Sequence, residues 1–116
     1  MKLSKKTKIF LAGHNGMVGS AILKKLRDNG YKNIIIRNRG QLNLLDQSKT
    51  YKFLKKNNPK LVIIAAAKVG GIIANMNNKS KFLYENLQIQ NNLIHGSYAA
   101  GIKNLFLLGS SCIYPK

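Results

Sequence analysis

Three glycines spaced three residues apart, Gly13, Gly16 and Gly19, lie between an apolar run at 8–12 and a segment with helical spacing. Glycine at these positions permits a sharp turn, lets backbone N–H groups approach a pyrophosphate, and lets the helix pack close to the strand. The spacing is a variant of the dinucleotide-binding fingerprint, although any tight strand-to-helix connection can use the same glycines. It predicts a cofactor-binding turn formed by Gly13, His14, Asn15, Gly16, Met17, Val18 and Gly19.

Two arginines, Arg37 and Arg39, stand at the end of the next apolar run, which covers 33–37. Dinucleotide-binding enzymes that use NAD place an acidic residue at this position, where it binds the ribose hydroxyls. Guanidinium groups favour a 2′-phosphate instead, through charge-assisted hydrogen bonds. The sequence therefore predicts NADP(H) as the cofactor, bound by Arg37 and Arg39. Two solvated arginines on a basic protein are the alternative interpretation.

The segment Asn43-Leu44-Leu45-Asp46 falls where the adenine ring of such a cofactor would lie. We expect Asn43 and Leu44 to contact the cofactor, with the Asn43 amide at a base edge. Asp46 is expected to cap the next helix, because a carboxylate can accept from the first free N–H groups of a helix. Capping alone would also explain either polar residue.

Four apolar runs alternate with segments of helical spacing; the runs cover 8–12, 33–37, 61–67 and 104–108. None alternates polar and apolar residues, so each is expected to be a strand buried on both faces. The first helix should present Met17, Val18, Ala21, Ile22 and Leu26 on one apolar face and stop at Gly30. The second should start after Asp46 and end before Pro59. The third should cover 79–100, with an apolar stripe formed by Leu83, Leu87, Ile94 and Tyr98.

Alternation of strands and helices predicts an α/β fold, a Rossmann-like doubly wound parallel sheet with flanking helices. We expect its four strands in the order 3-2-1-4, in one nucleotide-binding domain over residues 1–116. Ligands of such sheets bind beyond the carboxyl ends of the strands. The glycine turn, the arginines and the segments after 64 and 108 all fall there.

The charge of the chain is strongly positive, at +17, because 20 Lys and Arg residues face only Asp28, Asp46 and Glu85. Such a balance is typical of proteins that bind nucleic acids or anionic surfaces. The lysines are spread over helices and connections, without an Arg-rich stripe or an aromatic-interleaved motif, so we expect no nucleic-acid partner. There is no run of membrane-spanning length and no secretory signal, which predicts a cytoplasmic protein that does not enter a membrane.

Four segments together closely resemble the GDP-L-fucose synthases, a family of the extended short-chain dehydrogenase superfamily; they cover 12–22, 42–46, 65–72 and 108–116. The resemblance implies an NADPH-dependent, homodimeric enzyme that converts GDP-4-keto-6-deoxy-D-mannose to GDP-L-fucose. Such an enzyme epimerises C3 and C5 and then reduces C4. The C4 ketone acidifies the protons on both neighbouring carbons, so one acid/base set can serve both positions.

The resemblance also implies residue roles. Ser110 matches the catalytic serine that bonds the C4 oxygen, and Cys112 matches an acid/base of the epimerisation, a role that needs an accessible thiolate. Further cofactor contacts are implied for Ala65, Ala66, Ala67, Leu108 and Gly109, and substrate contacts for Lys68, Val69, Gly70 and Ser111. Taken alone, a Ser-Ser pair suits a turn and a single cysteine suits a core. No metal site is expected.

The family's Tyr-x-x-x-Lys pair should come after the serine segment, but the sequence stops at Lys116. One such match, Tyr51 to Lys55, lies in the expected second helix, away from the strand ends, and we do not expect it to be catalytic. The sequence is therefore expected to be the N-terminal part of the enzyme, inactive by itself and with weak NADPH affinity at best. Another NAD(P)-dependent nucleotide-sugar epimerase or dehydratase, and a non-catalytic nucleotide-binding module, are the alternatives.

Overall fold

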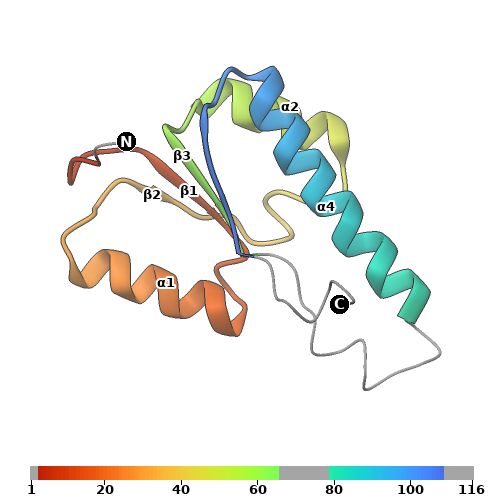
Figure 1. The fold of residues 1–116 in the computed structure, drawn as a ribbon, viewed down its shortest axis with the longest axis horizontal. Helices are drawn as coiled ribbons and strands as arrows, with labels where there is room; N and C mark the ends of the chain where they lie inside the picture. Colours follow the sequence, from red (N-terminus) through yellow and green to blue (C-terminus); the bar gives the residue numbers. More distant parts are fainter. Residues whose placement is uncertain (1–2, 66–78, 109–116) are drawn as a thin grey trace, which may run out of the picture.

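A parallel sheet of four strands forms the centre of the molecule (Figure 1). The computed structural model describes residues 3–65 and 79–108. The strands are β1 (Ile9–Ala12), β2 (Ile34–Ile35), β3 (Leu61–Ile64) and β4 (Asn104–Leu107). All three neighbouring pairs are parallel. The strands therefore all run in the same direction, and their carboxyl ends lie together at one end of the sheet.

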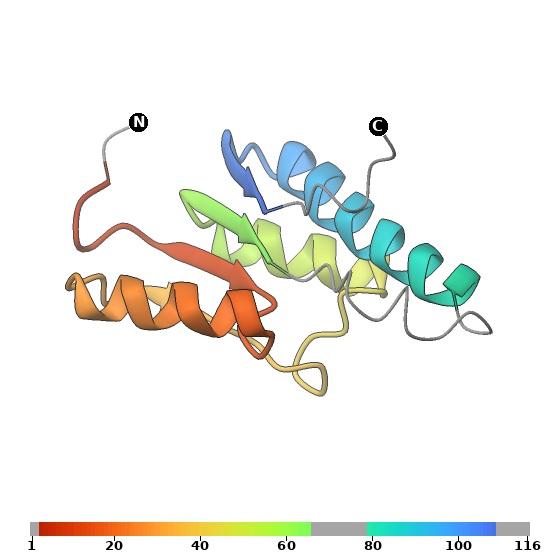
Figure 2. The same cartoon turned by 60° about the horizontal axis from the view of Figure 1, so that its bottom comes forward.

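Helices cover both faces of this sheet, as the predicted doubly wound fold requires. Helix α1 (Met17–Asp28) lies on one face, and α2 (Gln47–Asn57) and α4 (Lys79–Ala99) lie side by side on the other (Figure 2). Phe10 and Val62 point toward α2 and α4, while Ile9 and Leu61 point toward α1. Strands β1 and β3 are buried at every position, which confirms the prediction from their unbroken apolar runs.

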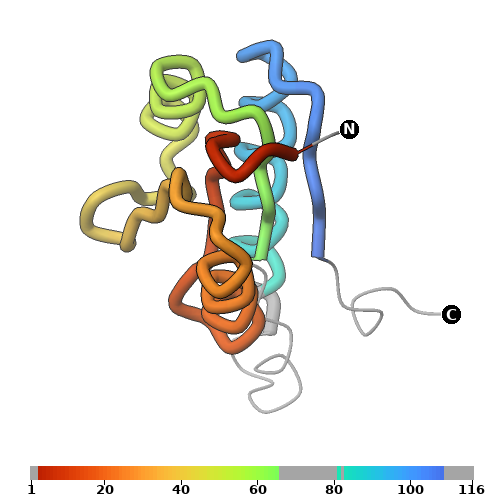
Figure 3. Tube along the Cα trace, turned by 90° about the vertical axis from the view of Figure 1, so that its left-hand side faces the viewer, coloured from red at the N-terminus to blue at the C-terminus, as the bar shows by residue number. Residues whose placement is uncertain are grey.

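The predicted strand order, 3-2-1-4, is wrong. The observed order is β2-β1-β3-β4, so the third strand pairs with β1 rather than with β2. Because α2 covers the face opposite α1, a right-handed crossover through it carries the chain back past β1. Beyond β2 the sheet has no further strand among the described residues, and segment 36–46 lies on that side of the molecule (Figure 3). The two connections that leave β1 and β2 thus diverge to opposite faces.

Strand β4 is not buried on both faces, contrary to the prediction. Leu105 packs against the core on the side of α2 and α4, but Phe106 is 56% exposed. The reason is position, because β4 is an edge strand and α1 packs against β1. An exposed aromatic ring on an edge strand is a recognised aggregation hazard.

The helices begin and end close to the predicted positions, but the faces that α1 and α4 turn toward the core differ from the predicted ones. Helix α1 packs the partly buried Ile22, Leu23 and Leu26 against the core, whereas the predicted face members Met17, Val18 and Ala21 are exposed. Gly30 comes after α1 with a φ of 86°, as expected for a residue that stops a helix. Along α4 the stripe of Leu83, Leu87, Ile94 and Tyr98 faces solvent; the buried side consists of Asn92, Leu93, Gly96 and Ser97.

Candidate functional site

A pocket of about 390 Å³ opens at the carboxyl end of the sheet, next to β1 and β2. Three walls form it: the turn after β1, the segment after β2, and one side of α4, with Ala65 just beyond β3. This is the point where successive connections leave the sheet on opposite faces, which is where ligands bind in open α/β sheets. The lining residues are Gly13, His14, Asn15, Gly16, Arg37, Asn38, Arg39, Leu42, Asn43, Leu44, Leu45, Ala65, Glu85, Asn86 and Ile89.

The glycine turn forms the wall nearest the sheet. Gly13 has a φ of 89°, in the left-handed region that side chains disfavour, and the N–H of Gly16 donates to the Gly13 carbonyl over 3.2 Å. Gly19 lies so close beneath the turn that a Cβ there would stand 1.8 Å from the Gly13 oxygen. Gly16 is the N-cap residue of α1, and no side chain caps this end of the helix. The first N–H groups of α1 are therefore suited to bind an anion.

The two arginines stand on a braced loop after β2. The backbone N–H of Asn38 donates to the side-chain oxygen of Gln41 (2.9 Å). The backbone N–H of Gln41 donates in turn to the side-chain oxygen of Asn38 (2.8 Å). The Arg37 guanidinium donates to the Ile36 carbonyl and lies 5.3 Å from the centre of the Phe53 ring. Arg39 has no hydrogen bond or ion pair within 3–65 and 79–108. Its full donor set is thus available to an anion.

The segment that leads into α2 forms the next wall. Asn43 accepts a hydrogen bond from the Leu45 N–H through Oδ1 (3.0 Å), so its Nδ2 group is left as a donor. Asp46 accepts from the Lys49 N–H through Oδ1 (3.0 Å), which confirms the predicted cap of α2. Leu44 packs against the core formed by β1, β3, α2 and α4. The wall therefore offers one amide donor beside an apolar surface, a combination that suits a nucleobase.

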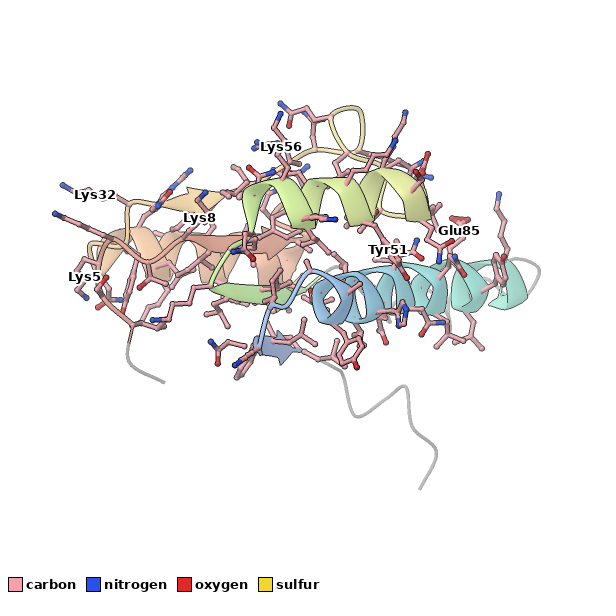
Figure 4. The ribbon with its side chains drawn as sticks, turned by 90° about the horizontal axis from the view of Figure 1, so that it is seen from above. Lys5, Lys8, Lys32, Tyr51, Lys56 and Glu85 are labelled. Carbon is pink, nitrogen blue, oxygen red and sulfur yellow. The ribbon has the colours of Figure 1, made fainter. Side chains whose placement is uncertain are left out.

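One carboxylate, Glu85, also lines the pocket, from the first half of α4. Figure 4 shows it at the opposite end of the molecule from Lys5, Lys8 and Lys32. The other two acidic residues serve local structure, since Asp46 caps α2 and Asp28 pairs with Lys24 at 2.9 Å. At the end of β2, where NAD-binding proteins carry an acidic residue, the pocket has only guanidinium and amide groups. The lining thus fits a dinucleotide that carries extra phosphate charge.

The predicted site residues separate into three groups. Those brought together around the pocket are Gly13, His14, Asn15, Gly16, Arg37, Arg39, Asn43, Leu44 and Ala65. Met17, Val18, Gly19 and Leu108 lie outside its lining; Leu108 packs on the α1 side of the sheet, and Met17 and Val18 are exposed. Outside the described residues fall Ala66, Ala67, Lys68, Val69, Gly70, Gly109, Ser110, Ser111 and Cys112.

Sequence reasoning missed six lining residues: Asn38, Leu42, Leu45, Glu85, Asn86 and Ile89. A usable signal existed for the last three, because Glu85 and Asn86 stand four and three residues before Ile89 and share a helix face with it. The Tyr51 to Lys55 match lies in α2, as expected, and neither residue lines the pocket. Tyr51 lies between α2 and α4 (Figure 4), 5.8 Å from the His95 ring, and does not line the pocket.

Comparison with known proteins identifies the family. Residues 9–116 match the NAD dependent epimerase/dehydratase family. The chain belongs to this family. It is 50% identical to a GDP-L-fucose synthase from Arabidopsis thaliana over 97% of its length, and 45% identical to one from Escherichia coli over 96%. It spans only 35% of the length of each of these relatives.

Solved structures of other proteins share this architecture. A GDP-mannoheptose C4 reductase from Campylobacter jejuni with NADP bound superimposes with a TM-score of 0.89 and is 37% identical. The alignment covers 98% of the chain and 36% of that protein. Within the described part of the chain, no helix is long and apolar enough to cross a membrane, and no three His, Cys, Asp or Glu residues gather around a possible metal ion.

Proposed function

We propose that the intact protein is an NADP(H)-dependent enzyme that converts GDP-4-keto-6-deoxy-D-mannose to GDP-L-fucose. One observation carries the proposal: Arg37 and Arg39 line the same pocket as the glycine turn, in a chain 45–50% identical to GDP-L-fucose synthases. The pocket supports the cofactor, and the similarity supports the substrate. Catalysis, substrate and assembly are proposed for the whole protein, because this chain spans only about a third of the length of these relatives.

Each wall of the pocket has a role toward the cofactor. The uncapped start of α1 and the backbone of Gly13 to Gly16 bind the pyrophosphate, because partial positive charge gathers at that helix end. Arg37 and Arg39 bind the 2′-phosphate, where a planar guanidinium matches phosphate oxygens better than an ammonium does. Asn43 and Leu44 contact the adenine. The bound nicotinamide supplies the hydride for the reduction at C4.

The reacting groups belong to the segments after β3 and β4. These strands are parallel neighbours, so both end on the side of the sheet where the pocket opens. We assign Ser110 to the C4 oxygen, where a hydroxyl donor stabilises developing negative charge. Cys112 moves protons at C3 and C5. Further cofactor contacts go to Ala65, Ala66, Ala67, Leu108 and Gly109, and substrate contacts to Lys68, Val69, Gly70 and Ser111.

The resemblance to GDP-L-fucose synthases extends the proposal to the cellular setting. The protein acts in the cytoplasm as a homodimer, on a free GDP-sugar, and binds neither nucleic acid nor a membrane. Within the described part of the chain, the lysines lie mostly on exposed helix faces and connections, and none of them lines the pocket.

The test is the choice between NADPH and NADH in the intact protein. We expect wild type to prefer NADPH, and Arg39→Glu to lose about 10- to 100-fold in NADPH affinity, the range for charge-assisted hydrogen bonds, while NADH binding stays unchanged or improves. Arg27→Glu is the matched control, because Arg27 is an exposed arginine in the last turn of α1. Both variants are also assayed for conversion of the keto sugar. Equal affinity of wild type for the two cofactors, or no turnover of that sugar, would refute the proposal.

A further inference from the structure

Asn92 is a nearly fully buried amide in the middle of α4, with only 2% of its surface exposed. Its Nδ2 donates to the backbone carbonyl of Leu44 over 2.8 Å, a bond between residues 48 positions apart. Its Oδ1 accepts from Gln88 Nε2 over 3.3 Å. A buried amide without partners is costly, so both bonds contribute to keeping this residue where it is.

The Leu44 carbonyl belongs to the wall of the cofactor pocket. Asn43, Leu44 and Leu45 all line that pocket, and the same segment ends in the Asp46 cap of α2. Figure 1 shows the chain after β2 running from the end of the sheet toward the start of α2, with α4 alongside. The opposite wall carries Glu85 and Ile89 of α4 itself. The bond from Asn92 therefore ties the two walls together at one point.

The Leu44 carbonyl decides which way the Asn92 amide faces. A backbone carbonyl can only accept, so the Asn92 Nδ2 group is directed to it. The Asn92 oxygen then faces Gln88, one turn earlier on α4, and accepts from its Nε2 group. A carboxylate at position 92 would keep the shape of the side chain but set two oxygens against each other. The orientation of this amide is thus part of the pocket's construction.

We propose, on the basis of the function proposed above, that Asn92 is a positioning residue for the adenine end of NADP(H). It does not line the pocket; it acts through the Leu44 carbonyl, which it holds at a fixed place relative to α4. Loss of the bond lets segment 43–45 move away from α4 and widens the site. The effect falls on the adenine half of the cofactor, because the glycine turn and the start of α1 are held separately.

The experiment compares binding of NADPH and of 2′,5′-ADP, which contains only the adenine half and the 2′-phosphate. In the intact protein, Asn92→Leu removes the donor and keeps the branched shape of the side chain, and Gln88→Leu leaves the bond to Leu44 in place but removes the partner of the Asn92 oxygen. We expect about tenfold weaker binding of both ligands for Asn92→Leu, the effect of one unsatisfied buried group, and a smaller loss for Gln88→Leu. Amide hydrogen exchange at Leu45 in the ligand-free protein should be faster in both variants.

Two controls separate positioning from general destabilisation. Asn91→Leu changes the exposed neighbour of the same type, and Ile102→Ala opens a cavity in the same core at the far end of α4. Ile102→Ala should lower stability yet bind 2′,5′-ADP within about twofold of wild type, a difference of under 1 kcal/mol. If Asn92→Leu binds 2′,5′-ADP like wild type, or loses no more than Ile102→Ala, the inference is overturned while the proposed function stands. A wild-type protein that binds neither ligand overturns both.

Discussion

Gly19→Ala tests whether the contact between the glycine turn and α1 builds the cofactor site. A Cβ at position 19 would lie 1.8 Å from the Gly13 oxygen, 2.7 Å from the Gly13 carbonyl carbon and 3.1 Å from the His14 Cα. All three are backbone atoms, so no side chain can rotate away. Restoring ordinary contact requires about 1.5 Å of extra separation between α1 and the turn. Overpacking of this kind costs about 1–3 kcal/mol or more.

The same shift displaces the pyrophosphate-binding N–H groups, so we expect NADPH affinity to fall more than about tenfold beside the loss of stability. Gly16→Ala is the matched control for stability alone, because its Cβ would meet only the Gly13 oxygen at 3.6 Å and Gly16 has an ordinary φ of −75°, whereas Gly16 itself belongs to the proposed pyrophosphate site. The assays are urea unfolding and fluorescence titration with NADPH on the intact protein. Equal losses of stability in the two variants, or an undisturbed Gly19→Ala protein, would show that close helix packing is not the cause of the site's shape.

Two further predictions concern stability alone. Asp46→Ala should lower the free energy of unfolding by about 0.5–2 kcal/mol in urea titrations, because it removes the cap on α2, whereas Asp28→Ala should cost at most about 0.5 kcal/mol, since its pair with Lys24 is exposed. Similar costs would contradict the capping role. Thr50→Val should be neutral or stabilising, because the buried Thr50 hydroxyl has no hydrogen-bond partner among the described residues. A loss above about 1 kcal/mol would mean that the hydroxyl is bonded.

Local signals in the sequence were sufficient for the elements and for most of the pocket. The apolar runs predicted β1 and β3, Asp46 predicted the start of α2, and the arginines predicted the wall after β2. The strand order was not predictable in the same way, because the direction of a crossover depends on which face its helix covers. That choice is made by tertiary packing, and no residue pattern in α2 encodes it locally.

Helix α4 shows the limit of periodicity most clearly. Its apolar stripe suggested a core-facing side, yet Leu87 and Ile94 face solvent while Asn92 and Ser97 are buried. Gly96 explains part of this, because a Cβ there would lie 2.9 Å from both Leu54 and Tyr51 of α2. Close approach of α2 and α4 thus selects small and polar residues on the contact side. The same approach brings Asn92 to Leu44, which a hydrophobic pattern could not indicate.

The arginines distinguish a specific site from the general basicity of the chain. Of the 20 Lys and Arg residues, only three are arginine. Two of these arginines, Arg37 and Arg39, line the pocket. Lysine supplies the positive charge nearly everywhere else, including Lys5, Lys8 and Lys32 at the opposite end of the sheet. A surface that needed only positive charge would have no reason to change residue type at one place. A planar, bidentate donor is the group that best matches a phosphate ester, and the change occurs where the pocket needs that donor.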